Sequence, residues 1–317
     1  RTMTNGARGI LVIKLGALGD FVQALGPFAA IRRHHAGDRV VLLTIAPFAD
    51  LARQSTLFDE VWLDDKPGAL NPSGWLALRR RLRAGHFARV YDLQTSDRSS
   101  FYFRLFWPGP YPEWSGIARG CSHPHANAAR DFMHTLERQA EQLRMAGIAE
   151  ARARAPDVSF VAADVARFDL KASYALLVPG GASHRPAKRW PVERFAALAT
   201  ELAGRGMVPV VLGVAAEGAL GARIRELCPA VRDLTGRTAL TDIAVLARGA
   251  RCAVGNDTGP MHLIAAAKCP AAVLFSGASD PALCAPRGAG VAILRREPLG
   301  ALDAGEALAA LKGLGVL

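Results

Sequence analysis

Short apolar runs alternate with amphipathic helical stretches along most of this chain, and this alternation constrains its fold more than any other feature. In the first half, runs rich in valine, leucine and isoleucine predict strands at residues 10–14, 39–46, 60–63 and 89–93. Apolar residues at helical spacing predict helices at 21–34, 48–54 and 71–84. Strands that alternate with helices favour a parallel, doubly wound sheet.

The second half repeats the pattern. Its expected strands are residues 174–178, 208–212, 231–234, 251–254 and 271–275, and its expected helices are 192–205, 219–227, 241–248 and 260–267. We therefore predict an α/β protein of two Rossmann-like, doubly wound parallel-sheet domains facing each other across a cleft. Ligands bind such sheets at the carboxyl ends of their strands.

A charged, alanine-rich stretch at residues 149–171 separates the two halves. We place the boundary near residue 165, which gives domains at 1–165 and 166–303. The last stretch, 304–317, is a helical pattern with no strand after it. A terminal helix of this kind can pack back on the first domain.

The chain has 39 Lys plus Arg against 28 Asp plus Glu, a formal net charge of +11, and only six of the basic residues are lysines. Arginine binds phosphate and carboxylate oxygens in pairs, so nucleic acid, an anionic membrane surface and a phosphorylated substrate all fit this charge. The five cysteines lack metal-site spacing, and residues 1–9 lack the apolar core of a signal peptide. No apolar run approaches the roughly 20 residues that cross a bilayer. We expect a cytoplasmic protein without zinc or disulfides.

The first motif, Lys14 to Asp20, stands where the first expected strand meets the first helix. Gly16 and Gly19 allow a ligand to approach the backbone closely. The dinucleotide-binding fingerprint requires a third glycine that this segment lacks. Asp20 could accept a proton from a substrate hydroxyl, or it could simply cap the helix.

The second motif, residues 178–191, follows the first strand of the second half. It places two glycines, Ser183 and four candidate cations before a helix, the cations being His184, Arg185, Lys188 and Arg189. Glycine-rich backbone and cations before a helix are typical of anion-binding loops. We favour a phosphate site over a merely solvated loop.

The third motif, residues 255–262, ends a strand and begins a helix with proline in its first turn. Backbone N–H groups at Thr258 and Gly259, together with the helix dipole, could hold a diphosphate, with His262 one turn further on. Alternatively, His262 is a core residue, and Asn256 and Asp257 cap the helix. The combination favours a ligand site.

Residues 101–114 contain seven of the 22 aromatic residues, with Arg98 before them and Arg119 after them. Aromatic surface beside arginine suits phosphorylated sugars or a lipid headgroup layer. The alternative is that the segment packs against its own domain.

Together, the three motifs resemble glycosyltransferase family 9, the ADP-heptose:lipopolysaccharide heptosyltransferases, which share the GT-B fold. The resemblance runs from Ile10 to about Pro281 and is most specific at residues 188–191 and 257–262. It implies an inverting, metal-independent transferase without a cofactor. It also implies a nucleoside diphosphate sugar donor, an acceptor hydroxyl on a lipopolysaccharide core or related glycolipid, and a place on the cytoplasmic face of a membrane. The first domain would hold the acceptor and the second the donor.

The resemblance also assigns roles to single residues. Asp20 resembles the general base, and Lys188 resembles the lysine that neutralises the departing diphosphate. The donor-binding candidates are Ser183, Glu217, Asn256, Asp257, Thr258, Gly259 and His262, and the acceptor-binding candidates are Gly16, Gly19, Arg98 and His134. Gly16 and Ala17 stand where the best-known relatives carry two serines, which leaves the donor heptose and the acceptor open.

Three other functions compete with this interpretation. A GT-B nucleotide-sugar epimerase needs the donor site but no acceptor. A nucleic-acid-binding protein would explain the charge but not the glycine-rich loops. A non-catalytic member of a polysaccharide assembly system would not require Asp20 and Lys188.

Overall fold

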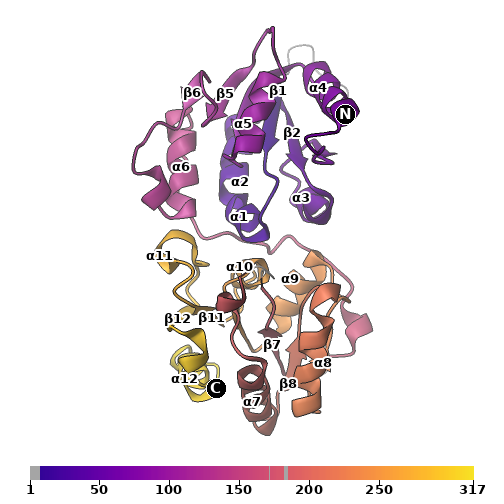
Figure 1. The fold of residues 1–317 in the computed structure, drawn as a ribbon, viewed down its shortest axis with the longest axis vertical. Coiled ribbons are helices and arrows are strands. Elements are labelled where there is room, and N and C mark those ends of the chain that lie inside the picture. Colours follow the sequence, from indigo (N-terminus) through magenta and orange to yellow (C-terminus); the bar gives the residue numbers. More distant parts are fainter. Residues whose placement is uncertain (1–7, 171, 182–184) are drawn as a thin grey trace. The chain divides into compact units, whose positions relative to one another are not determined.

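A computed structural model describes residues 8–170, 172–181 and 185–317. The chain forms two compact units, unit 1 (residues 1–154) and unit 2 (residues 155–317) (Figure 1). The division falls before residue 165 because the expected linker already packs in unit 2. Val158 and Val161 are buried there, and the Arg248 guanidinium donates to their backbone carbonyls.

Unit 1 contains a six-stranded sheet in the order β3-β2-β1-β4-β5-β6, and all its neighbouring strands are parallel. The strands are β1 (Gly9–Ile13), β2 (Arg39–Thr44), β3 (Glu60–Leu63), β4 (Phe87–Asp92), β5 (Glu113–Gly116) and β6 (His123–Pro124). The four expected strands are present, and two further short strands, β5 and the edge strand β6, extend the sheet. The central strand β1 is buried along its whole length, as expected for a strand covered on both faces.

The helices of unit 1 are α1 (Leu18–Gln23), α2 (Leu25–His34), α3 (Ala49–Gln54), α4 (Pro72–Ala84), α5 (Asp97–Arg104) and α6 (Thr135–Met145). The single helix expected at 21–34 is therefore two helices. Pro27 lies in the first turn of α2, where its missing N–H costs least, so the helix restarts shortly before it. Short 3₁₀ turns occur at Ala46–Phe48 and Arg130–Phe132.

Unit 2 repeats the architecture with a parallel sheet in the order β12-β11-β10-β7-β8-β9. Its strands are β7 (Tyr174–Val178), β8 (Val208–Val211), β9 (Arg232–Asp233), β10 (Cys252–Asn256), β11 (Ala271–Phe275) and β12 (Val291–Arg295). Its helices are α7 (Val192–Gly204), α8 (Gly218–Leu227), α9 (Leu240–Gly249), α10 (Gly259–Ala266), α11 (Pro281–Cys284) and α12 (Ala304–Gly313). Short 3₁₀ turns occur at Ala166–Phe168, Pro186–Lys188, Ala215–Glu217 and Leu299–Ala301.

The core of unit 2 includes the terminal helix. Ala307 and Leu311 of α12 are fully buried in a cluster with Trp190, Phe195 and Leu274. The indole Nε1 of Trp190 donates to the Leu302 carbonyl at 2.9 Å. Within unit 2, α12 packs against α7 and the β11–β12 edge of the sheet.

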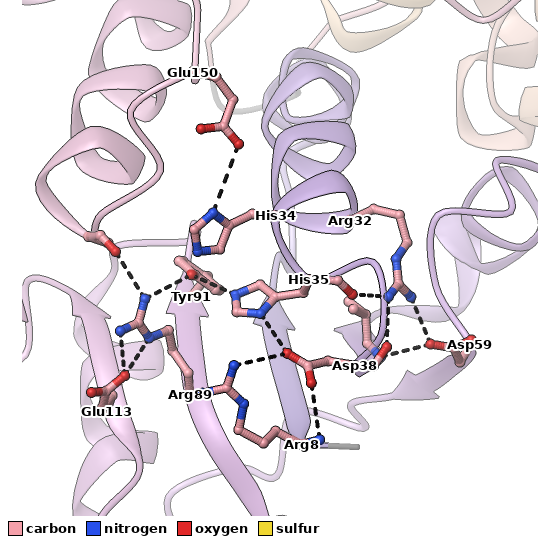
Figure 2. A network of polar contacts seen from close by, with 12 residues as sticks. Arg8, Arg32, His34, His35, Asp38, Asp59, Arg89, Tyr91, Glu113 and Glu150 are labelled. Carbon is pink, nitrogen blue, oxygen red and sulfur yellow. Dashed lines mark hydrogen bonds and ion pairs between the residues drawn. The ribbon is translucent and has the colours of Figure 1, made fainter. Parts of the chain in front are cut away.

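A polar network lies at the amino ends of β1 and β4 in unit 1 (Figure 2). The buried His35 is hydrogen-bonded through Nδ1 to Asp38 Oδ2 and through Nε2 to the Tyr91 hydroxyl, each at 2.9 Å. Arg89 donates to the same hydroxyl at 3.2 Å and also contacts Glu113. Burial lowers the pKa of His35 despite its hydrogen bond to Asp38.

No helix within the described residues is long and apolar enough to cross a membrane.

Candidate active site

The third sequence motif forms the end of β10 and the start of α10 in unit 2. Thr258 is the N-cap residue of α10, and Gly259 and Pro260 form its first turn. Thr258 makes no side-chain capping bond, and its Oγ1 is buried without a hydrogen-bond partner among the described residues. A buried hydroxyl beside unsatisfied helix N–H groups is well suited to an anionic ligand.

Lys188 and Asp257 meet beside this helix end. Lys188 Nζ donates to Asp257 Oδ2 at 2.7 Å, and the Ser279 hydroxyl donates to the same oxygen at 2.7 Å. The side chains of Lys188 and Asp257 are 14% and 9% exposed, so solvent screens the pair only weakly. The fold thus joins two sequence-predicted residues and adds Ser279.

Sequence reasoning missed Ser279, although a usable signal was present. Ser279 lies in the loop that follows β11, and β11 is the direct neighbour of β10 in the sheet. Carboxyl ends of adjacent parallel strands share one edge, so polar residues after β11 are natural partners of Asp257.

Gly181 lies between Thr258 and Arg189. A Cβ added to Gly181 would stand 3.5 Å from Arg189 Cγ and 3.6 Å from Thr258 Cγ2. Arg189 donates from Nη2 to the Gly181 carbonyl, while its buried Nε has no hydrogen-bond partner among the described residues. A second cation and the Thr258 side chain thus both lie next to Gly181.

Two other donor-binding candidates hold the backbone of this site. Asn256 is fully buried, accepts from Trp190 N at 3.0 Å and donates to the Pro179 carbonyl at 2.8 Å. Glu217 accepts from Gly181 N and Val214 N, each at 3.0 Å. These bonds join the loops after β7, β8 and β10.

Gly180 leaves room for the Glu217 carboxylate to approach the loop after β7. A Cβ on Gly180 would lie 2.1 Å from Glu217 Oε1, a distance that real contacts essentially never show.

Of the remaining candidates, His262 is buried in the first half of α10. Ser183 and His184 lie outside the described residues.

The first motif forms the turn between β1 and α1 in unit 1. Asp20 is the third residue of α1, and its Oδ2 accepts from Ala17 N at 3.3 Å. Gly16 has φ +134°, which L side chains rarely adopt, and Gly19 is buried in α1. Asp20 therefore makes a capping contact at the start of α1, which is the alternative to a general-base role. This contact uses only Oδ2, so it does not exclude a general-base role for Oδ1.

Two buried ionisable residues, Lys14 and Asp92, lie close to this turn. Lys14 Nζ donates to the Leu93 carbonyl at 3.0 Å, and burial lowers the pKa of Lys14 while Asp20 and Asp92 act to raise it. Burial raises the pKa of Asp92 to about 6, although its Oδ1 accepts from Gln94 N at 3.1 Å and from Thr95 N at 3.0 Å. Sequence reasoning did not single out Asp92, which is the last residue of β4 and adjoins β1.

The two other acceptor candidates have structural contacts. His134 is the buried N-cap residue of α6, and its Nδ1 accepts from Leu136 N at 3.2 Å. The Arg98 guanidinium lies 5.3 Å from the centroid of a Trp75 ring and donates to the Pro67 carbonyl at 3.3 Å.

The aromatic segment packs in part on its own unit. Trp114 is buried, with its ring centroid 5.3 Å from that of Phe103, and Phe101 contacts Trp75 at 5.1 Å. Beside α5, the segment borders a hollow of about 260 Å³ lined by Asp97, Ser100, Phe101, Phe103, Arg104 and Arg119. The alternative of local packing is therefore confirmed for the buried rings Tyr102, Phe106 and Trp114 but not for the exposed rings of the segment, and an arginine-lined hollow lies beside it.

The sequence model of glycosyltransferase family 9 (heptosyltransferase) matches residues 75–305, most of the chain. The chain belongs to glycosyltransferase family 9. The match begins after residue 20, so the Lys14 to Asp20 turn lies outside it.

A named relative that this family 9 member resembles in sequence is a heptosyltransferase. Over 120 residues it is 33% identical to lipooligosaccharide heptosyltransferase 2 of Haemophilus influenzae, an alignment that covers 36% of this chain and 34% of that protein. The chain thus matches only about a third of that relative's length.

Solved structures support the fold over almost the whole chain. The glycosyl transferase family 9 structure from Veillonella parvula has a TM-score of 0.83 at 19% identity and covers 97% of both chains. The E. coli ADP-heptose lps heptosyltransferase II has a TM-score of 0.77 at 20% identity, covering 96% of this chain and 98% of that one. The two-sheet architecture expected from the sequence is thus confirmed as that of the GT-B heptosyltransferases.

Proposed function

We propose that this protein is an inverting, metal-independent glycosyltransferase. It moves a heptose from ADP-heptose to a hydroxyl of a lipopolysaccharide core or related glycolipid. Family membership supports the reaction class, and the E. coli relative named for ADP-heptose and lps supports the substrates. The observation that carries the proposal is the Lys188–Asp257 pair beside the start of α10, next to the Thr258 hydroxyl, which has no hydrogen-bond partner among the described residues.

The donor diphosphate binds at the start of α10. Backbone N–H groups of its first turn and the Thr258 hydroxyl donate to phosphate oxygens, and His262 contacts the same group. Lys188 and Arg189 provide positive charge as the sugar–phosphate bond breaks. Protein cations and helix N–H groups thus perform the task that a metal performs in other transferases.

The acceptor hydroxyl attacks the anomeric carbon from the face opposite the diphosphate, which inverts the configuration there. The hydroxyl proton passes to Asp20, and the nucleoside diphosphate leaves with the electron pair of the broken bond. Asp257, held by Ser279, orients the donor sugar once Lys188 turns to the phosphate. No cofactor takes part.

The acceptor saccharide binds in unit 1. The hollow beside α5 provides Arg104 and Arg119 for anionic substituents and Phe101 for a sugar face. Gly16 and Gly19 allow the acceptor to approach the turn that carries Asp20. We place the protein in the cytoplasm, at the membrane face that presents the glycolipid.

Calorimetric titration with ADP, UDP and GDP tests the donor assignment. A strong preference for ADP is expected, whereas failure of all three nucleotides to bind would contradict the transferase. Incubation of the nucleotide sugar without acceptor tests the epimerase alternative. Release of free nucleotide without any glycosylated product would favour the epimerase.

A further inference from the structure

Aromatic side chains emerge from unit 1 where the segment between α5 and β5 crosses α4. Trp107 is 68% exposed and Tyr111 is 43% exposed, in contrast to the buried Trp114 and Phe106 of the same segment. The tyrosine ring is held in place by Phe103, with the ring centroids 4.9 Å apart. These two exposed rings are not used by the proposed reaction.

Two arginines of α4 hold this segment in place. Arg79 donates to the carbonyls of Leu105 at 3.1 Å and Trp107 at 2.7 Å. Arg83 donates to the Gly109 carbonyl at 2.8 Å and also contacts the Phe106 carbonyl. The exposed indole is therefore presented from a fixed backbone beside two guanidinium groups.

The same stripe of α4 adds an apolar residue and a further cation. Leu76, Arg79, Arg80 and Arg83 follow the spacing that places residues on one helix face. Leu76 is 42% exposed, and Arg80 is also exposed. We define the Trp107 surface as Leu76, Arg80, Trp107 and Tyr111, with Arg79 and Arg83 behind it.

The stretch from α4 to the start of β5 carries an excess of positive charge. Residues 72–113 contain seven arginines and no lysine, against three acidic residues, Asp92, Asp97 and Glu113, of which Glu113 pairs with Arg89. Asp92 is buried, so it adds nothing to the exposed surface. Tryptophan and tyrosine prefer the interface between lipid and water, and arginines are attracted to anionic headgroups.

The segment that carries Trp107 lies at the edge of the sheet opposite to the Asp20 turn, while Leu76 lies further back along α4. Arg83 is close to the end of α4, just before β4 begins at Phe87, so the held segment adjoins the amino ends of the strands (Figure 1). Asp20 follows β1 at the carboxyl edge. A flat partner could cover the Trp107 surface and leave the Asp20 turn uncovered.

We propose that the Trp107 surface docks on an anionic lipid bilayer. Trp107 and Tyr111 lie at the headgroup level, and Leu76 and Arg80 flank them along α4, with Arg80 facing anionic headgroups. This inference deepens the proposed function and rests on it in one respect, the glycolipid nature of the acceptor. It assigns the membrane contact to residues outside the donor and acceptor sites.

Vesicle sedimentation tests the docking. The full chain should sediment with vesicles of phosphatidylcholine mixed with phosphatidylglycerol, and much less with phosphatidylcholine alone. Arg80→Ala should weaken the partition coefficient about fivefold, the effect of one basic residue near an anionic surface. Trp107→Ser and Tyr111→Ser should weaken it further, and tryptophan emission should shift to the blue on anionic vesicles only while Trp107 is present.

Matched controls use exposed residues elsewhere. Phe132 is 82% exposed in unit 1, and Arg225 is exposed on α8 of unit 2, so Phe132→Ser and Arg225→Ala should bind as the wild type does. Unchanged binding by Trp107→Ser, or an equal loss in Phe132→Ser, would overturn the assignment. The assignment would also be overturned if the wild-type chain did not bind anionic vesicles, or if it bound vesicles with and without phosphatidylglycerol equally.

Activity measurements separate this inference from the proposed function. With a water-soluble acceptor that lacks lipid, Trp107→Ser and Arg80→Ala should transfer sugar at the wild-type rate. Loss of transfer in these variants would mean that the surface belongs to the acceptor site and would overturn the docking. Vesicle binding by a wild-type protein that transfers no sugar would refute the proposed function and leave the docking surface standing.

Discussion

Lys188 Nζ donates to Asp257 Oδ2 at 2.7 Å, although 69 positions separate the two residues in the chain. The pair connects the turn before α7 to the end of β10. A bound diphosphate would compete with Asp257 for the ammonium group. Donor binding would then exchange a carboxylate partner for phosphate oxygens, while Ser279 continues to hold Asp257.

Replacing Lys188 with alanine should reduce turnover about 10²- to 10³-fold, because the departing diphosphate loses a preorganised cation. The melting temperature should change much less than the turnover does. Steady-state kinetics and thermal unfolding measure both. Lys268→Ala is the matched control, since Lys268 also pairs with an aspartate, Asp157, at 2.8 Å in unit 2. A similar loss of turnover in the control would contradict the assignment.

Asp20→Asn should abolish transfer while donor affinity is retained, because the amide cannot accept the hydroxyl proton. Its side-chain oxygen can still accept from Ala17 N, so the start of α1 should persist. Transfer assays and nucleotide titration separate the two effects. Asp50→Asn, at an exposed site on α3, should keep full activity. Wild-type-like turnover in Asp20→Asn would eliminate Asp20 as the general base.

Ser279→Ala removes one of the two donors to Asp257 Oδ2. A hydrogen bond to a charged group contributes about 1.5–3 kcal/mol, so donor affinity should fall about tenfold or more. Ser279→Thr keeps the hydroxyl and should restore most of the affinity. Titration with the nucleotide sugar and with the free nucleotide should show the larger loss for the sugar. Equal affinity in the alanine variant would show that Ser279 does not position Asp257.

Stability should decline as the pH falls through the range in which an unfolded histidine becomes protonated, near pH 6.5. Burial lowers the pKa of His35 in the folded state, so the unfolded chain binds this proton more readily. Protonation at low pH therefore stabilises the unfolded state relative to the folded state. Urea titrations between about pH 7.5 and pH 5 give the free energy of unfolding at each pH, and this free energy should fall less steeply with falling pH for His35→Gln than for the wild type. His86→Gln, at an exposed site, should retain the wild-type slope.

Asp92→Asn should raise stability near neutral pH relative to the wild type. The folded-state pKa of Asp92 is raised from 3.8 to about 6, so its stabilising contribution is complete below 3.8 and is lost as the pH rises to about 6. Asparagine can still accept from Gln94 N and Thr95 N without an ionisation cost. Thermal melts from about pH 4 to 7.5 test this, with the exposed Asp97→Asn as control. A lower melting temperature for Asp92→Asn at neutral pH would contradict the prediction.

Much of the candidate site in unit 2 could be predicted because its parts are local. Glycines, cations and a proline-started helix placed directly after apolar strands indicate an anion site, and the sheet brings Lys188, Asp257 and Thr258 to one edge. Asn256 and Glu217 were predicted as donor contacts, and the structure shows in addition that their side chains hold loop backbone. Their donor-binding roles stay predictions, whereas these backbone contacts depend on the positions of the Trp190, Gly181 and Val214 N–H groups.

The amino-acid sequence by itself determined the alternation of strands and helices, the two αβ halves and the motifs at their strand ends. These follow from side-chain periodicity and from backbone limits on glycine and proline, which act over a few residues. The tertiary structure decided that α12 joins unit 2, that Ser279 shares an oxygen with Lys188, and that Trp107 is exposed while Trp114 is buried. Such outcomes depend on which distant surfaces exclude water from each other, and residues near one another in the chain do not specify that.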